Sequence, residues 1–321
     1  MTKLVQLTLA KIKYGGDSLG DDIRIEIECL NQSFDINKKI RNGTEVALNA
    51  EIGKFFFDQA AAQLPLTIRI IEQDLIFNDV GSAQEKFKVN LKNNASEYLT
   101  AVIQIEELRN YTTKKKAIFT ITLETQISDV ILYVAYQEKG WIWGRREDTK
   151  KMIDLVSHLR VRLERSDRAR QYFTIMEGAL RGVKASIKIA TDGTSYLKTE
   201  NPQTGPVHLM YSLSAKIAHF QNKTYATRDY PNDPEPWKRG VYDIEIPDFS
   251  HPGGQYYLPR AKLAKVWFLI GHEGKRYFHP GTFSLGCVTL TEIERWDDLC
   301  QILMKARKGD GRSIGTLEII D

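Results

Sequence analysis

Residues 1–135 alternate between apolar and polar side chains over most of their length. The alternation is regular in six runs, at residues 5–12, 23–30, 66–71, 86–91, 98–105 and 117–123, and polar turns such as Gly15-Gly16-Asp17 separate them. A period of two residues is that of a strand with one buried face, and many short strands without an intervening helical pattern favour an antiparallel sandwich. The sequence therefore predicts a β-sandwich over residues 1–135.

A different spacing follows this region. Between residues 149 and 173 apolar side chains recur every three or four positions, at Met152, Leu155, Val156, Leu159 and Leu163. This spacing is typical of an amphipathic helix, which would include His158 and continue over residues 168–184 with breaks at Gly178 and Gly182. We expect a helical connector over residues 136–185 that packs on a neighbouring domain, although a basic helix of this kind can also bind a membrane or a partner.

Composition and charge exclude several classes of protein. The chain has 321 residues, of which 42% are hydrophobic and 27% charged, and this length suggests two domains. Its net charge of +4 is mild and mixed along the sequence, so nucleic acid is not an expected partner. No stretch approaches the roughly 20 apolar residues of a transmembrane segment, and the first ten residues lack the apolar region of a signal peptide.

The chain has three cysteines, Cys29, Cys287 and Cys300. They are few, scattered and odd in number, so we expect no disulfide framework, no metal site and no cofactor. Cys29 lies in an alternating run, and Cys300 has helical spacing from Leu299 and Leu303 after Glu292, so both are predicted to fill a core.

Cys287 lies in a different setting, the run from His279 to Leu290. Residues 266–270 and 276–278 are typical of two strands joined by a hairpin turn at 271–275, so His279 would lie at a strand end. Pro280 breaks that strand and a second apolar run begins at Val288, so the chain must turn back and could place imidazole beside sulfur. Glycine at Gly286 leaves room for a substrate carbonyl, and the amides of residues 285–287 are candidate oxyanion donors. We interpret Cys287 as a thiolate nucleophile and His279 as its base.

These residues resemble the signature of the L,D-transpeptidases of the YkuD type, a strand-terminal His-Gly followed by Ser/Thr-x-Gly-Cys and an apolar residue. The match covers residues 186–290, where residues 237–244 are similar to the family's Thr-Pro-x-Gly-x-Tyr-x-Ile strand. The resemblance implies a mainly β catalytic domain over residues 186–321. It also implies that Cys287 is the nucleophile, His279 the base, Ser284 the hydroxyl that organises the loop, and Gly286 part of the oxyanion turn.

The activity that the resemblance implies is acyl transfer on peptidoglycan stem peptides through a thioester, by L,D-transpeptidation, amino-acid exchange, or carboxypeptidase or endopeptidase cleavage. Only eight positions separate His279 from Cys287, as in short-loop relatives among secreted antibacterial effectors. Leu285 and Thr289 replace polar residues that the family commonly uses near substrate carboxylates. His272 is a rival base, but its Gly-His-Glu-Gly setting is typical of a hairpin tip, which favours His279.

The loops at residues 229–237 and 247–259 are rich in proline, glycine and aromatic residues and are candidates for a binding rim. We list as candidate substrate contacts Thr289, Leu285, His272, Trp237, Tyr242 and His251. Two alternatives remain: a non-catalytic module that binds the cell wall or another surface, and a thiol peptidase or amidase that acts on another peptide. Peptidoglycan as substrate implies a bacterial envelope location reached without a visible signal peptide; otherwise the protein is cytoplasmic.

The N-terminal region carries a second resemblance. Residues 66–74, followed by Asn78-Asp79-Val80-Gly81, are similar to a strand and loop of the calcium-dependent, membrane-targeting β-sandwich domains of the synaptotagmin type. The resemblance implies a surface or protein partner for this domain. Oxygen ligands for calcium are present near its rim, at Asp17, Asp21, Asp22, Glu72, Asp74, Asn78 and Asp79. Because such residues also stabilise turns, we favour a likeness of fold without calcium binding.

Overall fold

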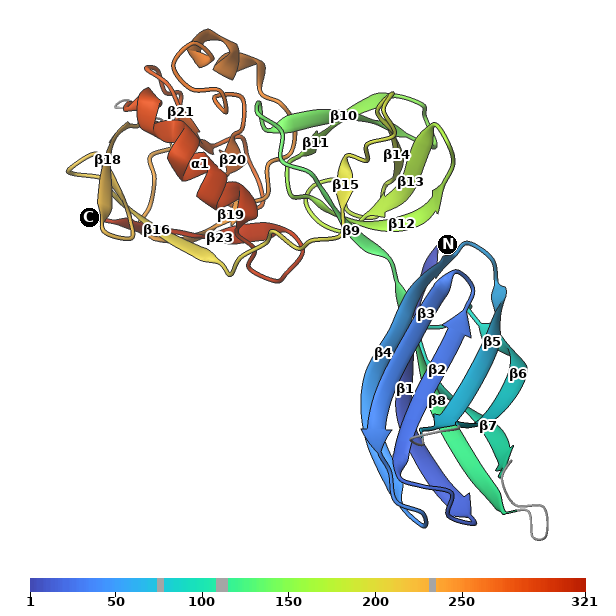
Figure 1. Cartoon of the computed structure of the whole chain (residues 1–321). Coiled ribbons are helices and arrows are strands. Elements are labelled where there is room, and N and C mark those ends of the chain that lie inside the picture. The colour runs from blue at the N-terminus through green and yellow to red at the C-terminus, as the bar shows by residue number, and fades with distance from the viewer. Residues whose placement is uncertain (74–77, 108–114, 231–234) are drawn as a thin grey trace. The chain divides into compact units, whose positions relative to one another are not determined.

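The computed structural model describes residues 1–73, 78–107, 115–230 and 235–321. The chain is mainly β and divides into two compact units, Met1–Val130 and Ile131–Asp321. Figure 1 shows the first unit in blue to green and the second in green to red. No helix within the described ranges is long and apolar enough to cross a membrane.

The first unit is an antiparallel sandwich. Its sheets have the strand orders β4-β1-β8-β7 and β3-β2-β5-β6, and the strands span β1 Lys3–Gly16, β2 Asp22–Cys29, β3 Gln32–Lys39, β4 Glu45–Phe57, β5 Ala61–Glu72, β6 Asp79–Asn90, β7 Ser96–Glu106 and β8 Lys116–Asp129. Alternate side chains of both sheets form one buried core, in which the Tyr14 and Phe119 rings stack 4.3 Å apart and Cys29 is fully buried. The predicted sandwich is therefore confirmed, although the unit ends at Val130 and not at residue 135.

The acidic side chains near the rim of this sandwich take structural roles where the contacts are described. Asp17 accepts a hydrogen bond from the Lys116 backbone N–H at 2.8 Å, and Asp22 pairs with Lys39 at 3.5 Å. Asp74 lies outside the described residues. Among the residues that are described, no group of three His, Cys, Asp or Glu side chains could hold a metal ion.

The predicted helical connector is wrong, because residues 136–185 form strands. They belong to a seven-stranded sheet with the order β11-β10-β14-β13-β12-β9-β15, whose strands span β9 Ile131–Val134, β10 Trp141–Arg146, β11 Met152–Val156, β12 Arg160–Ser166, β13 Arg170–Ile175, β14 Lys184–Lys188 and β15 Leu197–Lys198.

The helical spacing arises from two strands on either side of a turn. His158, which was expected inside the helix, has a φ of +70° between β11 and β12 and ends any helical run there. From that turn onward burial alternates, with Leu159, Val161 and Leu163 buried and Arg162 only half-buried between them. Apolar residues before and after the turn thus imitate a helical period.

An eight-stranded sheet carries the motif from His279 to Leu290. Its order is β19-β23-β16-β17-β18-β22-β21-β20, and the strands span β16 Val207–Ser212, β17 Ile217–Phe220, β18 Lys223–Arg228, β19 Gly240–Glu245, β20 Phe268–Leu269, β21 Tyr277–Pro280, β22 Val288–Leu290 and β23 Ser313–Ile320. A bridge between Ile244 and Ile270 brings its two edges together, so the sheet closes on itself. The helix α1, Trp296–Lys305, buries Trp296 5.5 Å from the Phe278 ring, and Cys300 is fully buried as expected.

A buried ion pair joins these two sheets of the second unit. Glu177, after β13, is 1% exposed and accepts a hydrogen bond at 2.9 Å from Arg307, which follows α1 and is 9% exposed. Arg307 also donates to the carbonyl groups of Met304, Ala306 and His158. Because a buried charge without a partner is costly, each residue holds the other's segment in place.

Replacing Glu177 with Gln should therefore lower the free energy of unfolding of the second unit by about 3–5 kcal/mol, because Arg307 then keeps a buried charge without its partner. The measurement is urea unfolding followed by tryptophan fluorescence, since all five tryptophans lie in this unit. Glu294→Gln, which breaks the exposed pair with Arg260, should have a much smaller effect, because water and salt screen that pair. Equal losses in the two variants would contradict the structural role of the buried pair.

Candidate functional site

The strand pairing places His279 and Cys287 on one face of the sheet. Strands β21 and β22 are parallel neighbours, with Phe278 opposite Val288 and His279 opposite Thr289. Because side chains alternate along a strand, Phe278 and Val288 point to one face, and His279, Cys287 and Thr289 to the other. The predicted base therefore lies in β21, and the predicted nucleophile, directly before β22, lies diagonally across from it.

Hydrogen bonds fix the imidazole of His279, which is 6% exposed. Its Nδ1 lies 3.0 Å from the Pro280 carbonyl oxygen, which only accepts, so Nδ1 carries the proton. Its Nε2 lies 3.1 Å from the Thr289 hydroxyl, which donates to it. Thr289 is fully buried, so this predicted substrate contact instead orients the base. The lone pair of the ring is therefore on Nε2, where it accepts the hydrogen bond from Thr289 and can take a proton once that hydroxyl turns to the Phe283 carbonyl oxygen, 3.5 Å away.

The imidazole of His279 lies at one end of a stack of four rings. Its imidazole stacks on Trp267 at a centroid distance of 4.0 Å, Trp267 stacks on His251 at 4.5 Å, and His251 stacks on Phe249 at 4.2 Å. A Cβ added at Gly253 would lie 2.9 Å from the Trp267 ring, so glycine leaves room for the indole there. The stack excludes water from one face of the base.

A half-buried carboxylate, Asp248, lies beside His251 of this stack. Asp248 accepts hydrogen bonds from His251 Nε2 at 2.9 Å and from the Tyr277 hydroxyl at 3.1 Å. Burial by itself would raise the pKa of Asp248, but the hydrogen bonds from His251, Phe249 N–H and Tyr277 lower it below its usual value. His251, expected at a binding rim, is only 5% exposed and holds Asp248 and Trp267 instead.

The turn before β22 positions Cys287. Gly286 has a φ of +95°, which favours glycine, and the Ser284 hydroxyl donates to the Cys287 carbonyl oxygen at 2.8 Å. The Tyr277 backbone N–H donates to the Cys287 sulfur at 3.3 Å. Within the described part of the chain, no hydrogen bond joins Cys287 directly to His279.

Burial leaves both reacting groups neutral. It lowers the pKa of His279 to about 4, against a smaller opposite effect of the Pro280 carbonyl. Burial also raises the pKa of the Cys287 thiol, while the Tyr277 N–H and the charge of Arg276 lower it by smaller amounts. The site therefore holds an unprotonated base and a protonated thiol, so the proton must move when the thiol reacts.

The rival base His272 is held by carboxylates. Its Nδ1 lies 2.8 Å from Glu245 and its Nε2 2.9 Å from Asp243, and the bond to Glu245 is the main cause that raises the pKa of His272. Arg312 pairs with the same Glu245 oxygen at 2.7 Å and Lys308 with Asp243 at 2.5 Å. His272 is thus part of an ion network, which leaves His279 as the better candidate base.

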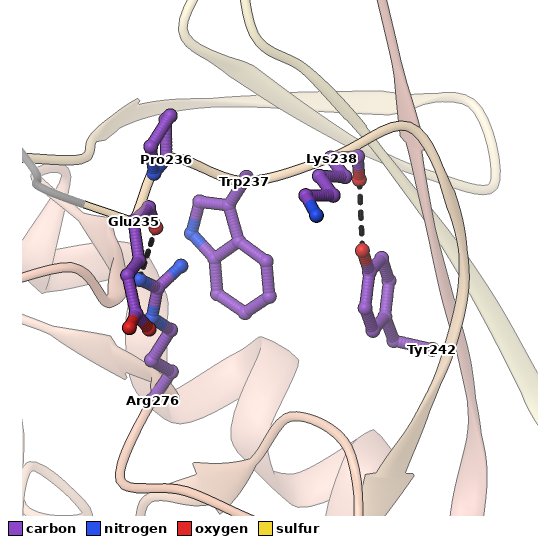
Figure 2. A pocket seen from close by; sticks show the side chains of 6 residues that line it. All are labelled: Glu235, Pro236, Trp237, Lys238, Tyr242 and Arg276. Carbon is purple, nitrogen blue, oxygen red and sulfur yellow. Dashed lines mark hydrogen bonds between the residues drawn. The ribbon is translucent and has the colours of Figure 1, made fainter.

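Four predicted contacts meet in one pocket beside the motif. Its volume is about 650 Å³, and Trp237, Tyr242, His272 and the exposed Leu285 line it together with Arg276. Trp237 and Tyr242 also line an adjoining pocket of about 460 Å³, which Figure 2 shows from close by. The structure therefore gathers the candidate substrate contacts except Thr289 and His251, which are buried next to the base.

Three residues near the site, Trp267, Asp248 and Tyr277, were not among the site residues predicted from sequence. Trp267 was expected only as part of an apolar strand, and Tyr277 as one of its strand aromatics. Asp248 stands in a loop three residues before His251, but Tyr277, its other hydrogen-bond donor, is 29 residues away in sequence. Their shared place beside His279 depends on the fold of the loop at 247–259, for which the sequence carries no local signal.

Comparison with known proteins leaves the family open. No family model and no curated protein matches the chain. Among solved structures, human GIVD cytosolic phospholipase A2 is similar at 8% identity with a TM-score of 0.24, over 81% of this chain and 33% of that chain. The chain thus spans about a third of that protein, and a likeness this low carries no conclusion about fold or function.

The raised pKa of Cys287 predicts how alkylation of its thiol depends on pH. The thiolate fraction at pH 7 should be smaller than for an ordinary thiol of pKa about 8.5, so the rate should still be rising above that pH. Iodoacetamide labelling followed by peptide mass spectrometry measures the rate at each pH. Cys29 and Cys300, both fully buried, are internal controls that should react only after unfolding. A plateau for Cys287 near pH 7 would contradict this protonation state.

Proposed function

We propose that this protein catalyses cysteine-dependent acyl transfer on peptidoglycan stem peptides. The observation that carries the proposal is the parallel pairing of β21 with β22, which puts Cys287 and an oriented His279 on one face. A nucleophile near a base that a third group holds in place is the arrangement that thiol acyl transfer requires, and here the Pro280 carbonyl is that third group. The sequence resemblance of the motif supplies the substrate class.

In the proposed reaction the Thr289 hydroxyl turns from His279 Nε2 to the Phe283 carbonyl oxygen, and Nε2 removes the thiol proton as Cys287 Sγ attacks the carbonyl carbon that precedes a D-amino acid. The N–H groups of the 285–287 turn stabilise the oxyanion. His279 then gives its proton to the leaving amine, and a thioester and a free D-residue result. An amine of a second stem peptide or a D-amino acid, or else water, attacks the thioester, passes a proton through His279 and regenerates the thiol.

Trp267 has a specific part in this reaction. When His279 takes the thiol proton it becomes a cation, and the indole face 4.0 Å away attracts that cation. Neutral imidazole gains less from the same contact. Trp267 therefore stabilises the charge that forms on His279 during the attack.

The proposed role of the N-terminal sandwich is targeting. A domain with its own core and no shared part in the Cys287 site is suited to binding a surface or a protein partner, which would bring the second unit to its substrate. The bacterial envelope is the corresponding place of action.

Incubation of the full-length protein with muropeptides, followed by mass spectrometry, tests the reaction. We expect loss of a terminal D-residue or its exchange, or new cross-links, and a covalent adduct on the peptide that contains Cys287. Cys287→Ala should abolish both products, whereas Cys29→Ala, which removes a thiol from the other unit, should retain them. Intact muropeptides with the wild-type protein would reject the proposed substrate, and turnover by Cys287→Ala would reject the nucleophile.

A non-catalytic wall-binding module is the second candidate, because the thiol is protonated and Cys287 is only 8% exposed. It predicts that muropeptides bind without change and that no thioester forms. A thiol peptidase with another substrate would instead form a thioester with a different peptide, and a Cys287 adduct with an unrelated activated acyl donor would identify that case.

Replacing Trp267 with Leu should slow thioester formation about tenfold, because the cation on His279 loses its aromatic face. Trp267→Phe keeps an aromatic face and should recover part of the rate. Trp143→Leu, which removes a 73% exposed indole from β10, is the matched control and should leave the rate unchanged. Stopped-flow detection of the acyl-enzyme measures these rates, and equal rates for Trp267→Leu and Trp143→Leu would count against the role of Trp267.

A further inference from the structure

The pocket beside Leu285 has a defined chemistry. In Figure 2 the indole of Trp237 lies between the guanidinium of Arg276 and the ring of Tyr242. Arg276 stands over the Trp237 ring at 4.7 Å from its centroid, and Tyr242 meets the indole edge-on at 5.4 Å. Arg276, Trp237 and Tyr242 therefore line one pocket, in which a guanidinium cation lies beside two aromatic rings.

Backbone contacts hold the residues of this pocket in place. Arg276 donates a hydrogen bond to the Glu235 carbonyl oxygen, and the Tyr242 hydroxyl donates to the Lys238 carbonyl oxygen at 2.9 Å. Tyr242 lies in β19, and Arg276 lies directly before β21. The pocket is thus formed between the edge strand β19 and the strand that carries His279.

The pocket extends toward the nucleophile. Arg276 immediately precedes Tyr277, whose backbone N–H donates to the sulfur of Cys287. Leu285, at the other side of the pocket, is two residues before Cys287 and is 71% exposed. Arg276 is also close enough for its charge to lower the pKa of the Cys287 thiol, so a molecule bound against Arg276 and Leu285 would lie near the turn that carries the thiol.

The charges that line the pocket favour an anion near Arg276. Lys238, Lys275 and Arg276 contribute three positive charges, and Glu235 and Glu273 contribute two negative ones. A guanidinium presents its N–H donors in a planar fork that matches a carboxylate. Stacked on Trp237, it is also held in a fixed plane.

We propose that Arg276 binds a carboxylate of the acyl donor in the pocket between Trp237, Tyr242 and Leu285. The substrate class is a peptide with a free carboxylate close to the bond that Cys287 attacks. Its apolar part lies on the indole face and against Leu285. This inference rests on the proposed function for the peptide, but the carboxylate site itself can be tested without it.

Two alkylating reagents of nearly the same shape test the site in the full-length protein. Iodoacetate carries a carboxylate and iodoacetamide is its neutral counterpart, so the ratio of their rates at Cys287 reports the attraction of a carboxylate to the pocket. Any effect of a variant on the thiolate fraction cancels in that ratio. We expect Arg276→Gln to lower the ratio about fivefold, and Arg276→Lys, which keeps the charge without the fork, to lower it less.

The matched control is Lys198→Gln, which removes a positive charge from β15 of the seven-stranded sheet and should leave the ratio unchanged. An equal fall in Lys198→Gln and Arg276→Gln would show a net-charge effect and overturn the proposal. Equal slowing of both reagents in Arg276→Gln would also overturn it, because Arg276 would then act on the thiol alone.

Peptide turnover separates this inference from the proposed function and distinguishes two sources of the carboxylate. Donor peptides are compared with the terminal carboxylate amidated or with a side-chain carboxylate amidated. Loss of the Arg276 dependence with one of them identifies the group that is bound. A changed reagent ratio without muropeptide turnover supports the carboxylate site and rejects peptidoglycan as substrate, whereas turnover with an unchanged ratio rejects the site and leaves the proposed function standing.

Discussion

The parallel pairing of β21 with β22 is the constraint on which the candidate site depends. Parallel neighbours usually need a crossover of a dozen or more residues, because the chain must return along the whole length of a strand. Here the strands have only four and three residues, so the seven residues 281–287 are enough to return the chain. The return places Cys287 directly before β22, two residues from Thr289, which is the partner of His279 in the register. A longer β21 would separate the thiol from the imidazole.

Strands could be predicted from sequence where buried apolar and exposed polar side chains alternate. The six alternating runs of residues 1–135 correspond to β1, β2, β5, β6, β7 and β8, and two of them extend one residue beyond β2 and β6. Strand β3 was missed because its residues are mostly exposed and polar, so its place is set by pairing with β2 and not by an apolar face. The false helix at residues 149–173 has a related cause, because the turn at His158 requires a positive φ that its residue type does not signal.

Only the part of the candidate site whose residues are close in sequence could be predicted. Ser284, Gly286 and Cys287 are close in sequence, and the structure keeps them together in one turn. The protonation state depends on residues that only the fold brings near, above all Trp267 over His279. Because burial, and not charge, dominates both pKa shifts, the expected low pKa of the Cys287 thiol is not found.

The buried pair of Glu177 and Arg307 limits where recombination can divide the second unit. The motif that carries Cys287 and the strand that precedes Glu177 lie in different sheets. If the two sheets were separated, each would keep one buried charge without its partner. Recombination at residue 186, where the sequence resemblance begins, would divide that pair. The compact unit Ile131–Asp321 keeps both residues of the pair, so the two sheets are expected to pass from one protein to another together.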